Sequence, residues 1–541
     1  MITRKSSPWL VGISLIPVLL IACCDDAYNR SLQSPPRELA TPPVGETHLD
    51  AGLTPAAPPP IALEFEAEIP NTETYDLIDE NNFQLVAANP LSTFSIDVDT
   101  ASYSNVRRFI NQRQRPPIDA VRIEELINYF SYDYPQPQGE EPFSVTTEVS
   151  SAPWNPQHQL VHIGLQGKTL AIEELPPSNL VFLLDVSGSM NQPNRLPLLK
   201  EGFKLLVDQL SEQDTVAIAV YAGAAGVVLP PTPGNEKQKI IAAIDGLQAQ
   251  GSTAGGEGIK LAYELATRML SEGKNNRVIL ATDGDFNVGV SSDAELVRLI
   301  ESYRDRGIYL TVLGFGMGNY KDSKMEKLSN HGNGNYAYID NLMEAKKVMS
   351  TELTGTLFTI AQDVKIQVEF NPAQVQAYRL IGYENRRLEN QDFHDDTKDA
   401  GEIGAGHSVT ALYEIIPVGV ESDVNLPAVD QLTYQQNVVS SEAYNSNELM
   451  RLKLRYKPPT ETASRLIEQP IINRSLPLNQ TSDNFRFAAA VAEFGMLLRN
   501  SQYRGNSSFQ QVLQLAESSK GVDLHGYRSE FIQLVKMTPQ R

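Results

Sequence analysis

The chain has 541 residues, of which 66 are acidic and 45 basic, and its formal net charge is -21. A body this acidic repels phosphate backbones, so we expect no nucleic-acid partner. The cysteines are the neighbours Cys23 and Cys24. Two adjacent cysteines form no ordinary disulfide, and they leave no Cys/His cluster for structural zinc. The length leaves room for roughly two to four domains.

Residues 1–22 have the layout of a signal peptide. Arg4 and Lys5 precede an apolar run over 9–22, which is too short for a comfortable membrane-spanning helix. Residues 23–74 are rich in Pro, Ala, Thr and Ser and show no apolar periodicity. We therefore expect a disordered, Pro-rich tether that, at ~3 Å per residue, could span on the order of 100 Å.

The end of the apolar run carries a second signal. Leu20-Ile21-Ala22-Cys23 resembles the bacterial lipobox. The resemblance implies that Cys23 carries acyl chains such as palmitate, which would hold the protein on a membrane of the bacterial cell envelope. Because Cys24 and not Asp follows, the outer membrane is favoured over the inner membrane. An ordinary signal peptide with a chance cysteine is the alternative.

Residues 75–140 are predicted to form an α-rich region, with helices over 100–112 and 119–130 and with Asp119 as a cap of the second helix.

Residues 178–358 alternate between apolar strand-like runs and amphipathic helical runs. This order predicts an α/β domain with a doubly wound, mostly parallel sheet, whose ligand site lies at the carboxyl ends of the strands. The expected strands cover 180–184, 215–221, 278–282, 308–315 and 336–339.

The regions on either side of the α/β domain alternate with a period of two. Such runs occur at 143–149 and 160–165, and again at 364–370, 409–415 and 450–456. We predict that strands in 141–177 pair with strands in 359–460, so that the α/β domain is inserted in an antiparallel β-sandwich. His162 falls on the opposite face from Val161 and Ile163, so we expect it to be exposed or half-buried. Helices are expected in 461–541.

Oxygen-bearing side chains follow three of the segments in the α/β domain. Asp185, Ser187 and Ser189 form an Asp-x-Ser-x-Ser run after the strand at 180–184. Thr253 lies in the glycine-rich loop 251–256, and Asp283 follows the strand at 278–282. Because these loops share the rim at the strand ends, their oxygens can turn toward one point, and such oxygens suit Mg²⁺. The alternative is that these residues cap helices and satisfy turns. Asp285 is expected to be a turn residue.

The order of these motifs resembles the von Willebrand factor type A domain with a complete metal-ion-dependent adhesion site, over about a third of the chain. The resemblance implies that Ser187 and Ser189 bind Mg²⁺, or Mn²⁺ or Ca²⁺, directly. Thr253 would bind directly or through water, and Asp185 and Asp283 mostly through water. One coordination position would then be left to water or to a carboxylate of an acidic side chain on a protein partner. The resemblance also allows the helix at 343–358 to shift when the site is filled.

The flanks at 95–102 and 121–130 are similar to a group of bacterial lipoproteins with a von Willebrand type A domain. We therefore expect an envelope-tethered, metal-dependent binding or scaffold protein and not an enzyme. A structural envelope protein with a vestigial metal site is an alternative from another class.

A phosphatase is the enzymatic alternative. Asp97-Val98-Asp99-Thr100 resembles the first motif of haloacid-dehalogenase-type phosphatases, with Asp97 as nucleophile and Asp99 as acid/base. The acidic pair that such enzymes need is incomplete, because Gly289 stands at its last position. Capping of the following helix by Asp99 or Thr100 is the preferred interpretation.

Overall fold

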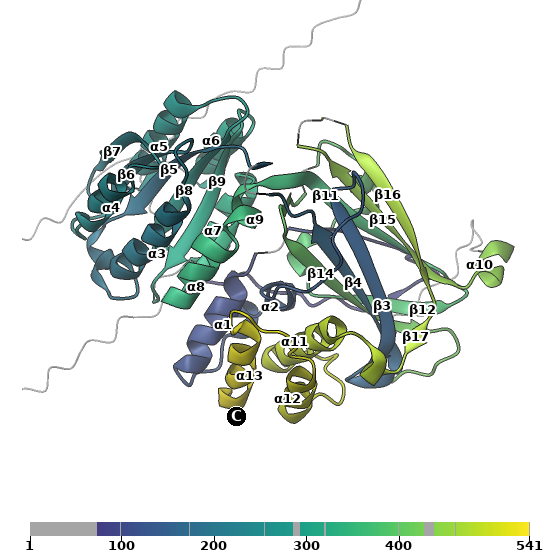
Figure 1. Cartoon of the computed structure of the whole chain (residues 1–541). Helices are drawn as coiled ribbons and strands as arrows, with labels where there is room; N and C mark the ends of the chain where they lie inside the picture. The colour runs from purple at the N-terminus through teal and green to yellow at the C-terminus, as the bar shows by residue number, and fades with distance from the viewer. Residues whose placement is uncertain are drawn as a thin grey trace, which may run out of the picture. The chain divides into compact units, whose positions relative to one another are not determined.

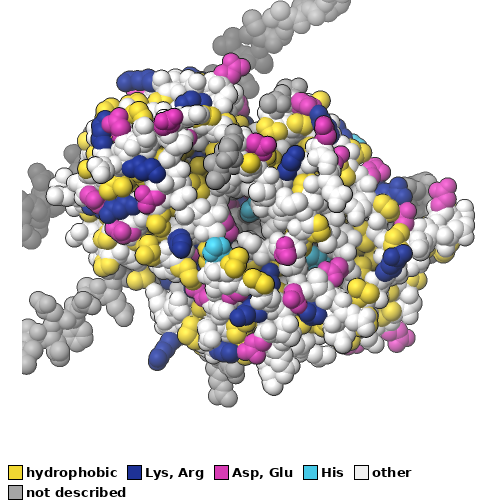
Figure 2. All heavy atoms as spheres, in the orientation of Figure 1, with side chains coloured by type: hydrophobic (Ala, Val, Ile, Leu, Met, Phe, Trp, Pro, Cys, Tyr) yellow, Lys and Arg dark blue, Asp and Glu magenta, His cyan; other side chains and the backbone are white. Residues whose placement is uncertain are grey.

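The computed structural model describes residues 73–539 except 98, 172–173, 254, 285–292, 319–320, 399, 427–437, 460 and 462. The expected signal peptide, Cys23, nearly all of the tether and Asp285 therefore lie outside the described residues. Within the part that is described, no helix combines the length and the apolar character that crossing a bilayer requires. Figure 2 shows that acidic and basic side chains intermingle over the visible face and do not gather by sign.

The α/β domain is built on a sheet with the strand order β10-β9-β8-β5-β6-β7. All neighbours are parallel except β7, which runs antiparallel to β6 at the edge and was not predicted. The strands are β5 (Ser178–Asp185), β6 (Thr215–Tyr221), β7 (Ala225–Pro233), β8 (Asn275–Thr282), β9 (Ile308–Phe315) and β10 (Tyr336–Ile339). The predicted doubly wound sheet is confirmed.

Helices cover both faces of this sheet (Figure 1). Every residue of β5 is buried, because alternate side chains pack in opposite directions. Phe182 packs with α3 and α4, whereas Val181 packs with α5, α6 and α7. These helices are α3 (Leu196–Gln209), α4 (Lys237–Asp245), α5 (Gly255–Met269), α6 (Asp293–Arg304) and α7 (Asp322–His331).

The sandwich has one sheet with the order β1-β12-β14-β4-β3-β17 and a second with the order β13-β11-β15-β16, on which β2 pairs with β11. Val161 of β4 pairs with Tyr413 of β14, so strands before and after the α/β domain share a sheet as expected. The strands are β1 (Gln84–Leu85), β2 (Leu91–Ser95), β3 (Phe143–Ala152), β4 (Asn155–Gly167), β11 (Thr359–Phe370), β12 (Val375–Ile381), β13 (Ile403–Gly404), β14 (Ser408–Pro417), β15 (Glu448–Lys457), β16 (Arg465–Ile472) and β17 (Ser475–Leu476).

Helices from both ends of the described chain pack into one apolar cluster that also contains Leu160 of β4 and Leu412 of β14. They are α1 (Ala101–Asn111), α2 (Ile123–Asn128), α11 (Asp483–Arg499), α12 (Phe509–Ser518) and α13 (Tyr527–Met537); the short α10 (Ser441–Asn445) lies apart from this cluster. Because this layer covers the second face of β4, the expectation for His162 is wrong. His162 is fully buried, its Nε2 lies 2.8 Å from the hydroxyl of Tyr134, and burial lowers its pKa to about 3.

Two other local expectations differ from the structure. Asp119 does not cap a helix, because its carboxylate accepts a hydrogen bond from the backbone N–H of Ile78 at 3.1 Å and α2 begins four residues later. The helix expected at 343–358 is broken into α8 (Leu342–Lys346), a π-helical turn at Lys347–Thr351, and α9 (Leu353–Leu357). Short π-helical turns often mark functional segments.

Candidate metal centre

The carboxylate of Asp185 ends β5 and is fully buried. One oxygen accepts the backbone N–H of Ser187 at 2.9 Å. The other accepts the hydroxyls of Tyr221 at 3.1 Å and Thr282 at 3.3 Å. Burial, with a further contribution from the charge of Asp283, raises the pKa of Asp185 to about 6. The group is therefore largely ionised at neutral pH, and its neighbours fix its orientation.

The two serines lie close together in the turn after Asp185. The hydroxyl oxygens of Ser187 and Ser189 are 3.0 Å apart. The N–H of Gly188, between them, donates to the carbonyl of Gly251 at 2.9 Å. This bond joins the serine turn to the glycine-rich loop in which Thr253 lies half-buried. The structure thus brings two of the predicted loops into direct backbone contact.

The third loop reaches the serine turn through an arginine that the sequence did not predict. Asp283, which follows β8, is fully buried, and its carboxylate lies 2.7 Å from the guanidinium of Arg195. The same guanidinium nitrogen donates to the carbonyl of Ser189 at 2.8 Å, and the other terminal nitrogen donates to the carbonyl of Met317 at 2.7 Å. Arg195 therefore links Asp283 to Ser189.

Arg195 lies one residue before α3, in a stretch with no motif of its own, so the sequence offered no signal for it. Its path is open because Gly316 has no side chain. A Cβ atom at Gly316 would lie 2.3 Å from Nε of Arg195, and the backbone there has a φ of +80°, which favours glycine.

The donor set at this rim suits a small divalent cation. Ligands at about 2.1 Å in octahedral coordination lie about 3 Å from their neighbours. The hydroxyl oxygens of Ser187 and Ser189 have this separation, at 3.0 Å. The carboxylates of Asp185 and Asp283 outweigh the positive charge of Arg195 by one negative charge. Hydroxyl and carboxylate oxygens are the ligands that Mg²⁺ prefers.

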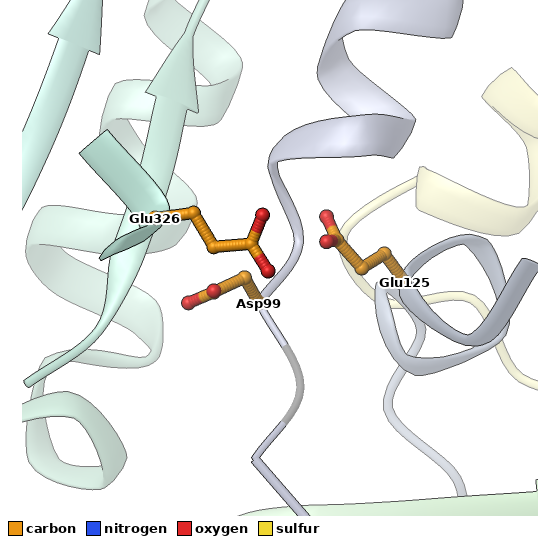
Figure 3. Close-up of side chains that lie close together, drawn as sticks. All are labelled: Asp99, Glu125 and Glu326. Carbon is orange, nitrogen blue, oxygen red and sulfur yellow. The ribbon is translucent and has the colours of Figure 1, made fainter. Parts of the chain in front are cut away.

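A second acidic cluster lies where α2 and α7 approach the segment before α1. Ligand oxygens of Asp99, Glu125 and Glu326 are within 4.8 Å of one another. Figure 3 shows the carboxylates of Glu125 and Glu326 facing each other. Two arginines hold this cluster: Arg122 pairs with Glu125, and Arg386 bonds Glu326 at 2.9 Å and Asp99 at 3.2 Å. The cluster is therefore a set of ion pairs that joins the flanking segments to the α/β domain.

The contacts of Asp99 also correct the capping interpretation. Thr100 stands at the cap position of α1, but its side chain makes no capping hydrogen bond. Asp99 instead accepts the backbone N–H of Tyr336 in β10 at 2.8 Å. Asp99 is 3% exposed and Asp97 pairs with Arg386 at 3.0 Å, so the geometry gives no support to the phosphatase alternative.

Comparisons with known proteins agree with this architecture. The family model for the von Willebrand factor type A domain matches residues 179–351, and a model described as von Willebrand factor matches 69–162. The chain therefore contains a von Willebrand factor type A domain, a class of domain that generally mediates protein–protein interactions. These matches indicate no enzymatic family.

A model described as the C-terminal part of the uncharacterised protein YfbK matches residues 355–540. YfbK of Escherichia coli (strain K12) is 45% identical over 475 residues, which cover 86% of this chain and 81% of YfbK. The chain belongs to the YfbK family.

Among solved structures, BatB from Bacteroides thetaiotaomicron is 26% identical, and the match covers 32% of this chain and 97% of BatB, with a TM-score of 0.28. A von Willebrand factor type A protein from Catenulispora acidiphila is 14% identical and covers 85% of this chain and 91% of its own, with a TM-score of 0.40.

Proposed function

We propose that this protein is a metal-dependent binding module of the bacterial envelope. Asp185, Ser187, Ser189, Thr253 and Asp283 would hold Mg²⁺, or Mn²⁺ or Ca²⁺, at the rim of the α/β sheet. The bound cation would supply an electrophilic position for a carboxylate oxygen of an acidic side chain on a protein partner. The observation that carries this proposal is the 3.0 Å separation of the two serine hydroxyls beside buried Asp185.

The charges of the site support capture of an acidic group. Asp185, Asp283 and Arg195 together have one negative charge in excess, which attracts a divalent cation. Once a divalent cation is added, the set has one positive charge in excess, which a partner carboxylate neutralises. Because Arg195 already pairs with Asp283 at 2.7 Å, the cation and the guanidinium compete for that carboxylate.

Part of the proposal concerns attachment to the envelope. Cys23 would carry the lipid and residues 24–74 would serve as the tether, with the outer membrane as the favoured location. A Cys23→Ser variant is expected to leave the membrane fraction and appear in the soluble fraction. Equal membrane retention of the variant and the wild type would contradict the lipid anchor.

The metal site is tested by calorimetric titration of Mg²⁺ into the lipid-free protein. Ser187→Ala is expected to lower the affinity at least about tenfold, because a direct ligand is lost. Ser252→Ala, in the same glycine-rich loop as Thr253, is the matched control and is expected to bind like wild type. Equal affinity in wild type and Asp185→Ala would show that the site is vestigial.

The partner is tested by affinity capture from envelope extract in Mg²⁺ and in chelator. Capture by the wild type is expected in Mg²⁺ and not in chelator, and Ser187→Ala is expected to lose it in both. Addition of free glutamate at high concentration should compete if the partner offers a carboxylate. Capture that is insensitive to chelator and to Ser187→Ala would remove the metal from the binding mechanism.

A further inference from the structure

Three polar side chains of the sandwich form a hydrogen-bonded row that no part of the binding function uses. Nδ1 of His158 in β4 lies 2.5 Å from Oε1 of Glu414 in β14. Nε2 of the same ring lies 2.7 Å from Oγ of Ser422, in the loop after β14. Glu414 pairs with Leu160 across the strands, so His158, two residues away on β4, shares its face. His158 and Glu414 are buried, whereas Ser422 is half-buried.

The side chains around His158 and Glu414 determine which atoms of this row carry protons. Burial would raise the pKa of Glu414, but the guanidinium of Arg379 at 2.8 Å and the bond with His158 hold the pKa below its ordinary value. An ionised Glu414 accepts the proton on Nδ1. Nε2 is then an acceptor, and it receives the side-chain N–H of Asn155 at 3.2 Å and the hydroxyl of Ser422.

We propose that Ser422 and His158 form a nucleophilic site that hydrolyses carboxylic esters, with Glu414 as the positioning residue. The arrangement of serine, imidazole and carboxylate is the one that activates a serine hydroxyl, and it is recognised by geometry and not by chain order. The backbone N–H of Val424 donates to Oγ of Ser422 at 3.1 Å and would stabilise negative charge on that oxygen. This activity would be independent of the metal site.

The proposed reaction proceeds in two halves. Oγ of Ser422 bonds to the ester carbonyl carbon while its proton moves to Nε2 of His158, and the carbonyl π electrons move to oxygen. In this proposal the side-chain N–H of Asn155, which lies 3.2 Å from Nε2 of His158, would turn to donate to that oxyanion. Collapse breaks the bond to the alcohol oxygen, which takes the proton from Nε2. Water then repeats these steps on the acyl-serine, releasing the carboxylic acid and restoring Ser422.

The surroundings of Ser422 indicate the class of ester. Val420, Val424 and Leu426 are partly buried and pack against the cluster of Phe83, Ala377 and Ile416. These side chains offer an apolar surface beside the nucleophile, suited to a short apolar acyl group. Glu421 and Asp423, on either side of Ser422, are exposed and carry like charge, which disfavours anionic substrates. The expected substrates are therefore neutral esters of short apolar acids.

The test uses a fluorophosphonate probe and p-nitrophenyl butyrate with the whole folded protein. We expect covalent labelling on the peptide that contains Ser422, located by mass spectrometry, and release of p-nitrophenol. Ser422→Ala should reduce both by at least about a hundredfold. The matched control is Ser446→Ala: Ser446 is also half-buried and also accepts a turn N–H, from Glu448 at 3.0 Å, but within the described residues its hydroxyl bonds to no histidine.

Two further arms separate the outcomes. Labelling should be unchanged in chelator, which would show that the metal site takes no part in the labelling reaction. Glu414→Gln should lower the labelling rate strongly and Glu414→Asp should restore part of it, with folding checked by thermal denaturation. Absent labelling of well-folded wild type, or labelling that Ser422→Ala leaves unchanged, would overturn the proposal.

Discussion

The guanidinium of Arg195 lies 2.7 Å from the buried carboxylate of Asp283, which is one of the proposed metal ligands. Replacing Arg195 by Met keeps much of the side-chain volume and removes the charge. We expect Arg195→Met to bind Mg²⁺ at least about tenfold more tightly, because a nearby positive charge no longer repels the ion. Calorimetric titration against wild type measures the change.

A matched control for this charge is Lys204→Met on helix α3, which begins one residue after Arg195; Lys204 pairs with Glu201 and Asp245 at the surface. It should leave Mg²⁺ affinity within about twofold. Arg195→Met should also have a lower melting temperature in chelator, since the buried carboxylate of Asp283 loses its ion pair with Arg195, and Mg²⁺ should restore it. Weaker Mg²⁺ binding than wild type would mean that Arg195 orients Asp283 for the metal.

The second prediction concerns Gly316, whose missing side chain leaves room for Arg195. Gly316→Ala would place a Cβ 2.3 Å from Nε of Arg195 at a φ of +80°. Gly307 has the same φ, but a Cβ there meets nothing within 4 Å. Gly307→Ala should therefore cost about 1 kcal/mol of unfolding free energy, and Gly316→Ala about 2 kcal/mol more. Urea denaturation of both variants measures the difference, and equal losses would show that Arg195 moves aside freely.

The third prediction concerns Arg107 of α1, which is fully buried and joins three segments. Its guanidinium pairs with Asp340 after β10, with Glu344 of α8 at 2.8 Å and with Glu530 of α13 at 3.0 Å. Arg107→Met should lower the free energy of unfolding by about 3–5 kcal/mol, because it leaves buried carboxylates unpaired. The measurement is urea denaturation followed by circular dichroism.

The control for Arg107 is an exposed ion pair. Arg268 and Glu264 lie 4.0 Å apart with side chains that are 73% and 60% exposed. Arg268→Met should therefore change stability by no more than about 0.5 kcal/mol. If Arg107→Met costs as little as Arg268→Met, the three segments are not held together by this arginine.

The fourth prediction is a pH dependence that arises from Glu493 in α11. Burial raises the pKa of its carboxyl to about 7. The folded protein therefore keeps this proton between about pH 4.5 and 7, where the unfolded chain loses it. Stability falls as pH rises through that window. Glu493→Gln has no proton to lose and should be more stable than wild type at pH 8, by on the order of 3 kcal/mol.

Urea denaturation at several pH values measures this effect. The advantage of Glu493→Gln should vanish at pH 4, and Glu517→Gln, at an exposed position of α12, should show no such trend. An advantage that is the same at pH 4 and pH 8 would mean that the titration of Glu493 does not control stability.

Much of the α/β domain was predictable because its signals are local. The runs that became β5, β6 and β9 form strands of seven or eight residues, and the motif residues Asp185, Ser187 and Ser189 stand at the end of the first of them and in the turn after it. What escaped prediction depends on partners distant in sequence. Arg195 meets Asp283 across a separation of 88 residues, and Asp99 meets Tyr336 instead of capping α1. No spacing along the chain encodes these contacts.

The same limit explains two features of the sandwich. His162 was expected to be exposed or half-buried because the sequence shows that β4 alternates. The sequence does not show that the second sheet of the sandwich packs on one face of β4 and the helical layer on the other. The row of His158, Glu414 and Ser422 joins residues more than 250 positions apart, through the register of β4 on β14.

The split sandwich also determines the order in which the protein can fold during synthesis. Val161 of β4 must wait for Tyr413 of β14, which the ribosome adds about 250 residues later. At ~5–20 residues per second, that delay is roughly 10–50 s. The α/β domain is completed within the interval and can fold first. The β3–β4 hairpin meanwhile keeps an open strand edge, which can pair with other chains until β14 is made.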